Sequence, residues 1–104
     1  MRRMEGDKIA VKVHKTENGV VIGACDAHLV GKRLKEKGLL LEIRKEFYFE
    51  RHSTPEELSE LLDECVTANL VGEMAVEVYC RKNPEARAVL VNIGGVPHLQ
   101  VFQL

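Results

Sequence analysis

The chain has 104 residues, of which 45% are hydrophobic and 30% are charged, and its formal net charge at pH 7 is −1. This length predicts one domain, 1–104, with a core large enough to fold without a disulfide or metal staple. The three cysteines are an odd number and lack the spacing of a disulfide scaffold. This excludes the class of disulfide-rich secreted proteins and favours a protein of a reducing compartment. No apolar run approaches the roughly 18 residues of a membrane helix, and the charged start is unlike a signal peptide, so we expect a cytoplasmic protein without membrane contact.

Charge is distributed unevenly along the chain. Residues 1–51 contain 12 Lys and Arg against 8 Asp and Glu, a balance of +4, whereas residues 52–104 contain 3 against 8, a balance of −5. Positive charge is densest in GKRLKEKG, residues 31–38. Such a patch indicates an anionic partner, or only a solvated loop that keeps the protein soluble, and the sequence leaves both interpretations open.

The first half of the chain has the patterns of short strands. Alternating apolar residues at 9–13 predict a half-buried strand, Asn18-Gly19 predicts a hairpin turn, and 20–25 predicts the returning strand. The run 39–43 predicts a third strand, which 47–49 continues after a bend.

A helical turn is expected between these strands. Asp26 is in position to cap the turn at 27–30, and Gly31 would end it in a left-handed conformation.

Two helices follow in the middle of the chain. Thr54, Pro55 and Glu57 have the spacing of an N-cap, a first-turn proline and a capping box. The apolar residues that follow at helical spacing are Leu58, Leu61, Leu62 and Cys65.

The second helix is predicted from about Leu70 to Lys82, capped by Asn69 and stopped by Asn83-Pro84. Gly72 inside such a helix costs about 1 kcal/mol relative to alanine, so we expect close packing there, either by another part of the chain or by a ligand.

Two strands, 88–93 and 96–102, form a C-terminal hairpin around Gly94-Gly95. The order of elements predicts an α+β fold, with a mainly antiparallel sheet, an N-terminal and a C-terminal hairpin, and two consecutive helices on one face. The side chains expected to be buried under this sheet are Leu58, Leu61, Leu62, Met74 and Val78.

Along the last strand, His98, Gln100 and Phe102 share one face. Pro97 lacks a backbone donor, so this strand is expected to start at a sheet edge. The polar and aromatic strip is interpreted either as a binding surface or as the solvated side of the sheet.

Metal and nucleotide sites are not predicted. Cys25 and His28 are spaced like a zinc pair, but the remaining Cys and His residues form no second pair, so we expect no metal and no cofactor. Gly31-Lys32 lacks the other residues of a phosphate loop, which excludes a nucleotide-hydrolysing loop of that kind.

A thiol enzyme is an alternative. Cys25 would be the nucleophile, with His28 or His98 as the base, whereas the adjacent Asp26 works against the thiolate. The competing interpretation is a packed cysteine at the end of a strand.

Four stretches taken together, ACDAHLVGK, FYF, TANLVGEMAVE and GGVPHLQ, resemble in order and spacing the archaeal family called domain of unknown function 424. The resemblance extends from about Val11 to Leu104. The positions that match the family pattern are Cys25, Asp26, Gly31, Phe47, Tyr48, Asn69, Gly72, Glu73, Gly94, Gly95, Pro97 and His98. Ala27 stands where the family has an acidic residue, which argues against an acid role there. The resemblance implies an archaeal cytoplasmic protein grouped with RNA and translation factors, and it implies no activity.

The function expected from the sequence is a small RNA- or ribonucleoprotein-binding module linked to translation. The alternatives are a protein-interaction subunit, whose acidic second half meets a basic partner, and a thiol-dependent enzyme using Cys25, Asp26 and His98. The candidate RNA-binding residues are Lys32, Arg33, Lys35, Lys37, Phe47, Tyr48, Asn69, Gly72, Gly94, Gly95, His98 and Gln100. Phe49 and Phe102 are further candidates for base stacking.

Overall fold

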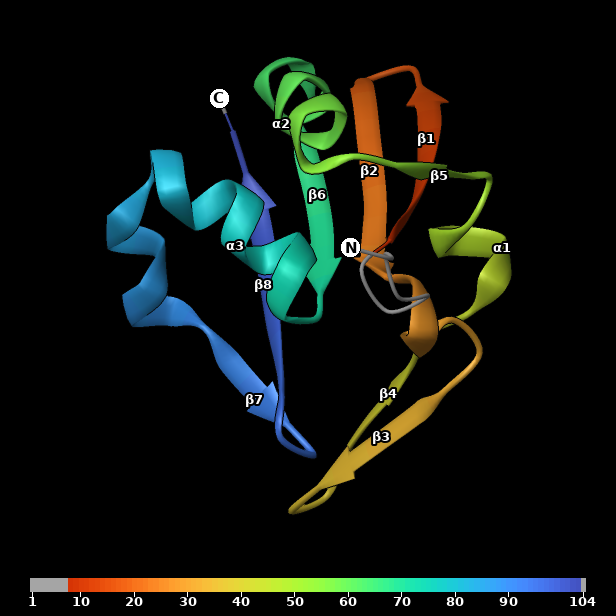
Figure 1. Cartoon of the computed structure of the whole chain (residues 1–104), viewed down its shortest axis with the longest axis vertical. Helices are drawn as coiled ribbons and strands as arrows, with labels where there is room; N and C mark the ends of the chain where they lie inside the picture. The colour runs from red at the N-terminus through yellow and green to blue at the C-terminus, as the bar shows by residue number, and fades with distance from the viewer. Residues whose placement is uncertain (1–7, 104) are drawn as a thin grey trace, which may run out of the picture.

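The structure is a computed structural model that describes residues 8–103. A six-stranded sheet with the order β5-β1-β2-β6-β8-β7 forms its centre (Figure 1). Its strands are β1 (Ile9–Thr16), β2 (Gly19–Asp26), β5 (Arg51–Ser53), β6 (Thr67–Val71), β7 (Val91–Ile93) and β8 (Val96–Phe102). Both predicted hairpins are present, and the mainly antiparallel α+β fold is confirmed.

One pair of strands within residues 8–103 is parallel, namely β2 and β6. Parallel strands end at the same edge of a sheet, so the carboxyl ends of β2 and β6 meet there. Strand β8 pairs antiparallel with β6, which brings its beginning to this edge as well. Three segments far apart in the sequence therefore converge at 26, 72 and 95–97.

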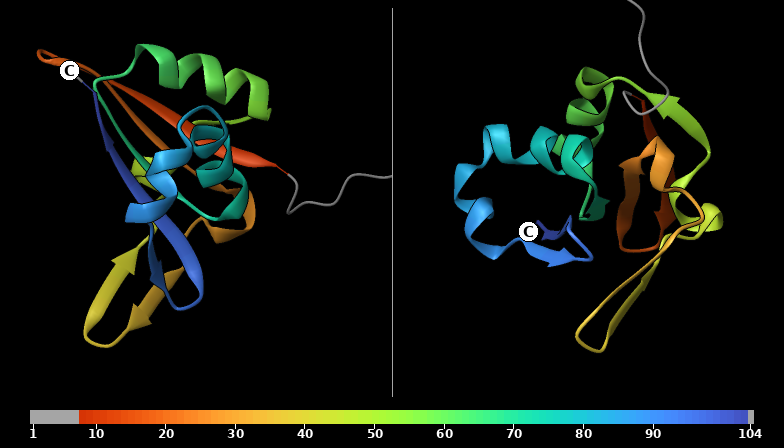
Figure 2. Two further views of the ribbon diagram at one scale, coloured as in Figure 1. Left: turned by 90° about the vertical axis from the view of Figure 1, so that its left-hand side faces the viewer. Right: turned by 60° about the horizontal axis from the view of Figure 1, so that its bottom comes forward.

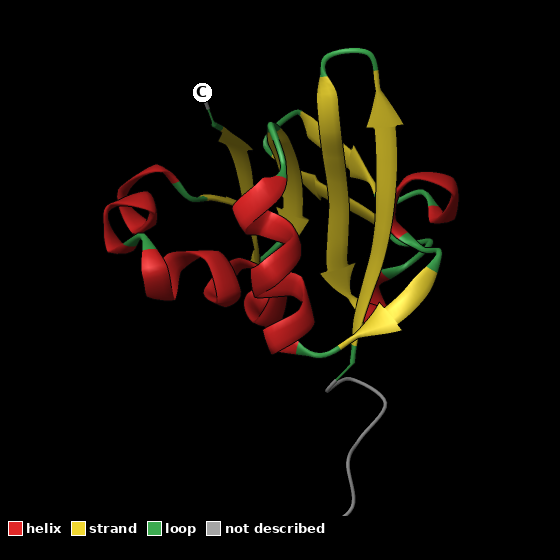
Figure 3. Cartoon of the chain, turned by 90° about the horizontal axis from the view of Figure 1, so that it is seen from above, coloured by secondary structure: helices red, strands yellow, loops and turns green. Residues whose placement is uncertain are grey.

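Helices α2 (Pro55–Glu64) and α3 (Glu73–Lys82) cover one face of the sheet (Figure 3). The predicted capping box is present, with the Thr54 hydroxyl accepting from the Glu57 N–H and the Glu57 carboxylate accepting from the Thr54 N–H. Of the predicted core residues, Leu58 and Leu62 are buried, and the half-buried ones that pack against them are Leu61, Met74 and Val78. None of the helices in residues 8–103 is long and apolar enough to span a membrane.

The opposite face is covered over β1 and β2 by a second apolar cluster. It is built by the 3-10 turn Ala27–Leu29, by α1 (Lys45–Tyr48) and by the hairpin of β3 (Arg33–Glu36) and β4 (Leu39–Glu42). The buried members of this cluster are Ala10, Cys25, Leu29, Ile43, Tyr48 and Val71.

The second helix begins at Glu73, and its predicted start at Leu70 is wrong. Residues 67–71 form β6, in which Ala68 and Leu70 face the helices while Asn69 faces away, so burial follows a period of two. Asn69 is therefore not a helix cap. Gly72 takes that position with a φ of 105°, which breaks the helical pattern one residue before α3.

Two further elements differ from the prediction. Residues 47–49 do not continue a strand, because Phe47 and Tyr48 lie in α1. Residues 88–90 are not strand either, since the 3-10 segment Pro84–Val89 starts at the predicted proline stop and continues to the edge of β7. The strand was predicted from the apolar composition of residues 88–91. Apolar and polar residues do not alternate in this run, and its side chains are not buried on one face as those of a strand would be.

Candidate functional site

The basic segment forms an arm rather than a loop. Strands β3 and β4 make a separate two-stranded sheet that projects from the body (Figure 2). Lys37 and Gly38 form its turn with φ values of 49° and 86°, the left-handed conformations that a two-residue hairpin turn needs. Leu34 and Leu41 pack against the second cluster and fix the base of the arm.

The arm carries the four predicted basic residues, and all of them are exposed: Lys32, Arg33, Lys35 and Lys37. The Arg33 Nε lies 3.4 Å from the Glu42 carboxylate, which also binds Arg44 at 3.2 Å. Among residues 8–103, none of the three lysines has an ion-pair partner. Their ammonium groups are therefore available to an external anion.

Gly94 and Gly95 join the arm to the sheet. Both have a positive φ, 60° and 83°, as the turn between β7 and β8 requires. The Gly94 N–H donates to the Glu36 Oε1 at 2.7 Å, and a Cβ on Gly94 would lie 3.4 Å from the Lys35 carbonyl oxygen. The glycine pair thus has a structural role at the contact between arm and body.

The half of the sheet that α1 and the arm leave uncovered is called here the open face. Its residues come from β6 and β8, and they are Thr67, Asn69, His98, Gln100 and Phe102. The prediction that His98, Gln100 and Phe102 share a face is confirmed, because Leu99 and Val101 between them are buried under the helices.

The open face offers polar groups beside an exposed ring. Phe102 is 73% exposed, and Asn69 lies directly opposite Gln100 in the register of β6 and β8. Within the described chain, the side chains of Asn69, His98 and Gln100 make no hydrogen bond. Burial lowers the pKa of His98, so its imidazole is neutral at pH 7 and can accept as well as donate.

Strand β8 is not at an edge, which corrects the interpretation of Pro97. Asn92 and Pro97 pair one step beyond the turn-flanking pair Ile93 and Val96, at a position where the two strands exchange no hydrogen bond. On its other side β6 has already ended, and the Pro97 carbonyl accepts from the Gly72 N–H at 2.9 Å. No ladder bond is lost to the missing N–H.

The aromatic residues of α1 are packed inward. Tyr48 is buried, and burial, followed by the nearby Cys25, raises its pKa to about 12. Phe47 stacks on His14 at 4.6 Å and lies over Gly23, where a Cβ would come within 2.7 Å of the ring. In this conformation Tyr48 offers no face to a base, which removes it from the predicted RNA-binding set.

Asp26 and Gly72 meet at the edge where β2 and β6 end. The Asp26 carboxylate accepts from the backbone N–H groups of Met74 and Ala75, at 3.2 and 2.9 Å. Asp26 thus caps α3, and its side chain does not cap the turn that follows it. Gly72 is closely packed as expected, and its neighbour is this carboxylate.

The electrostatics of Asp26 follow from this burial. Its pKa is raised because burial disfavours the charged form, and this outweighs the Ala75 and Met74 N–H groups, which lower it. A groove of about 330 Å³ opens beside it, lined also by His28, Glu73 and Pro97. The first N–H groups of α3 are already bound by a carboxylate of the chain itself, so this helix end is not a vacant anion site.

The surroundings of Cys25, next to Asp26, disfavour the alternative that the protein is a thiol enzyme. Cys25 is fully buried, and burial, followed by the Asp26 charge, raises the pKa of its thiol to about 12. A nucleophilic cysteine needs the opposite shift. Cys25 and His98 both pair with Val71, one from each side, so the buried Val71 separates them.

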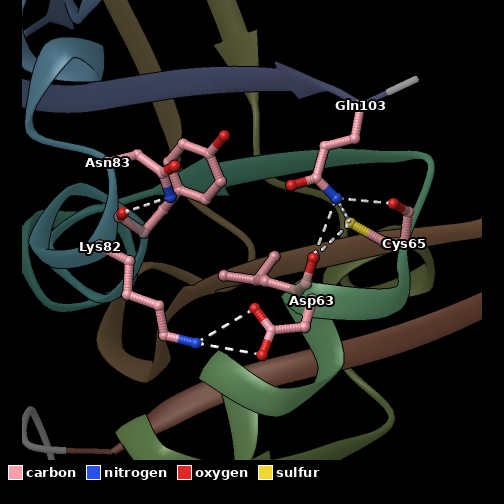
Figure 4. Close-up of polar contacts among 7 residues, drawn as sticks. Asp63, Cys65, Lys82, Asn83 and Gln103 are labelled. Carbon is pink, nitrogen blue, oxygen red and sulfur yellow. Dashed lines mark hydrogen bonds and ion pairs between the residues drawn. The ribbon is translucent and has the colours of Figure 1, made fainter.

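A groove between α2 and α3 was not predicted from the sequence. Its volume is about 460 Å³, and its apolar walls include Pro55, Met74 and Val78. Lys82 also lines this groove, and its Nζ binds both oxygens of Asp63 at 3.1 Å (Figure 4). Nearby, the Gln103 amide donates to the Leu62 and Cys65 carbonyl oxygens. The only sequence signal was the apolar spacing of Met74 and Val78, which indicated core.

Comparisons with known proteins agree with the resemblance. A family model described as a protein of unknown function (DUF424) matches residues 13–104. The chain belongs to this family. A solved structure of an uncharacterized conserved protein from Methanopyrus kandleri covers 93% of this chain and 92% of its own, with 32% identity and a TM-score of 0.75. A comparison with curated proteins finds no match. In this DUF424 member, matched positions Asp26, Gly72 and Pro97 lie together at one sheet edge.

Proposed function

We propose that the protein is a cytoplasmic RNA-binding module that holds single-stranded RNA between the arm and the open face. The observation that carries the proposal is the arm itself, which projects three lysines without ion-pair partners in the described chain: Lys32, Lys35 and Lys37. Lysines on a projecting hairpin can reach phosphates without disturbing the core, and phosphate contacts supply most non-specific affinity for nucleic acid. A link to translation rests on the family resemblance alone.

The open face supplies what the arm lacks. Phe102 offers a ring on which a base can stack, and the amides of Asn69 and Gln100 have the donors and acceptors that base edges need. Arg33 contributes less than the lysines, because Glu42 already binds it. Duplex RNA hides its bases, so this arrangement favours single strands.

The salt dependence of binding tests the role of the arm. Three phosphate contacts give a slope of about −2 for log K against log salt, and Lys32→Ala with Lys35→Ala should flatten it by about 1.4. The measurement is a titration of a mixed single-stranded RNA pool at several salt concentrations. The matched control is Lys15→Ala with Arg51→Ala, which removes two exposed cations of β1 and β5 and should leave the slope unchanged. No binding near about 100 mM salt at about 10⁻⁴ M protein would reject RNA as the ligand.

Phe102→Ala tests the open face separately. Loss of one stacked base should weaken binding by about 1–3 kcal/mol and leave the salt slope unchanged, since stacking releases no counterions. The same titrations give this result, and Val89→Ala, an exposed apolar change in the 3-10 segment Pro84–Val89, serves as control. Unchanged affinity would restrict the site to the arm.

A second candidate function is protein interaction, and the groove between α2 and α3 favours it. This groove lies in the acidic half of the chain and is apolar at Met74 and Val78. Its geometry is compatible with a partner segment that carries apolar and basic side chains.

A further inference from the structure

The tip of the arm is apolar on both of its faces. Leu39 is 52% exposed and Leu40 is 50% exposed. Because consecutive side chains of a strand point to opposite faces, these two leucines lie on opposite sides of the arm. Lys35 pairs with Leu40 in the register, and Lys37 forms the turn beside them. Insertion of the tip between two walls would bury both leucines.

The groove between α2 and α3 has an α3 wall that is apolar at Met74 and Val78 and an α2 wall that is apolar at Pro55. Its charged residues are largely neutralised: Arg87 binds both oxygens of Glu77 at 2.8 and 2.9 Å, and Arg81 lies 3.5 Å from the same carboxylate. Lys82 is held by Asp63 (Figure 4). Two lining carboxylates remain, Glu56 and Glu73, and neither has an ion-pair partner among residues 8–103.

We propose that this groove receives the arm tip of a second copy of the chain. One of the two leucines would contact the α3 wall at Met74 and Val78, and the other would contact the α2 wall at Pro55. Lys35 and Lys37 would pair with Glu56 and Glu73. The charges that lack partners on the tip thus match those that lack partners in the groove. The two halves of the chain are also complementary in charge. Residues 1–51, which include the arm, carry +4, and residues 52–104, which include the groove, carry −5.

The arm of one chain does not reach its own groove. Figures 1 and 2 show the arm projecting from the end of the molecule that lies away from α2. The contact therefore joins two different surfaces of two chains, and such a contact either closes reciprocally or continues from chain to chain. The proposal does not rest on RNA binding. Lys35 and Lys37 can bind either RNA phosphates or the groove carboxylates of a second copy, but not both at once. Self-association is therefore expected of the protein without bound RNA.

Charge exchange provides the test. Lys35→Glu with Lys37→Glu reverses the tip, and Glu56→Lys with Glu73→Lys reverses the groove. Sedimentation equilibrium of nuclease-treated protein should give a wild-type mass that rises with concentration above the 11.7 kDa of one chain. Each reversed variant alone should sediment as a monomer. An equal mixture of the two should associate again, because every tip then meets a groove of opposite charge.

A second variant guards against loss of folding. Leu39→Ser with Leu40→Ser changes only exposed side chains and should also give monomers, with circular dichroism and melting temperature like those of the wild type. A wild type that stays monomeric at all concentrations would overturn the proposal. This is also the result expected if the two leucines insert into RNA and not into a second copy of the chain. Association that survives all three variants, or a mixture that stays monomeric, would overturn it as well.

Discussion

Gly72→Ala is expected to lower the free energy of unfolding by about 3 kcal/mol. Gly72 has a φ of 105°, a conformation that costs a residue with a Cβ about 1–3 kcal/mol. The new Cβ would also lie 2.7 Å from both oxygens of Asp26. This carboxylate cannot rotate away without breaking its hydrogen bonds to Met74 and Ala75. Strain and a clash with a fixed group therefore add, and the large loss follows.

Gly38→Ala is the matched control. Gly38 has a similar φ of 86°, but no atom would lie within 4 Å of its Cβ. This substitution introduces the strain without the clash and should cost about 1 kcal/mol. Urea unfolding followed by circular dichroism measures both variants. Equal losses would show that the Asp26 contact adds nothing, and that only backbone conformation requires glycine at 72.

The surroundings of Gly72 show which elements could be predicted from the sequence and which could not. Local signals were sufficient for the hairpins and for α2, whose capping box involves residues only three apart. They failed at β6, because Leu70 and Met74 have helical spacing although one belongs to a strand. Gly72 separates the two elements, but the side chain packed against it belongs to Asp26, which lies far away in the sequence. A single sequence cannot show which distant residue a glycine accommodates.

The candidate site also has features that could be predicted from the sequence and features that could not. The basic cluster could be predicted, since charge density is a local property of residues 31–38. That these residues form an arm with an apolar tip could not, because it depends on Leu34 and Leu41 packing against the opposite face of the sheet. The groove between α2 and α3 arises from the spacing of two helices. Composition carries no information on that spacing, and the groove was therefore missed.

Asp26→Ala is expected to cost about 2–3 kcal/mol at neutral pH. The substitution removes two charge-assisted hydrogen bonds and leaves the N–H groups of Met74 and Ala75 without their acceptor, the second of them buried. Asp26→Asn keeps one oxygen that can accept, so it should cost about 1 kcal/mol. Denaturant unfolding at one pH compares the two. If alanine and asparagine are equally tolerated, the capping bonds do not stabilise α3.

The pH dependence of this difference gives the decisive measurement. Burial raises the pKa of Asp26, so the folded protein binds this proton more tightly than the unfolded chain, whose aspartate has a pKa of about 3.9. The stability that this proton contributes is complete below that pH and is lost as the pH rises through the folded pKa. The free energy of unfolding of the wild type, measured relative to Asp26→Asn, should therefore fall across this window and level off above it. A difference that instead grows with rising pH would mean that the two N–H donors outweigh burial, and that Asp26 is held in its charged form.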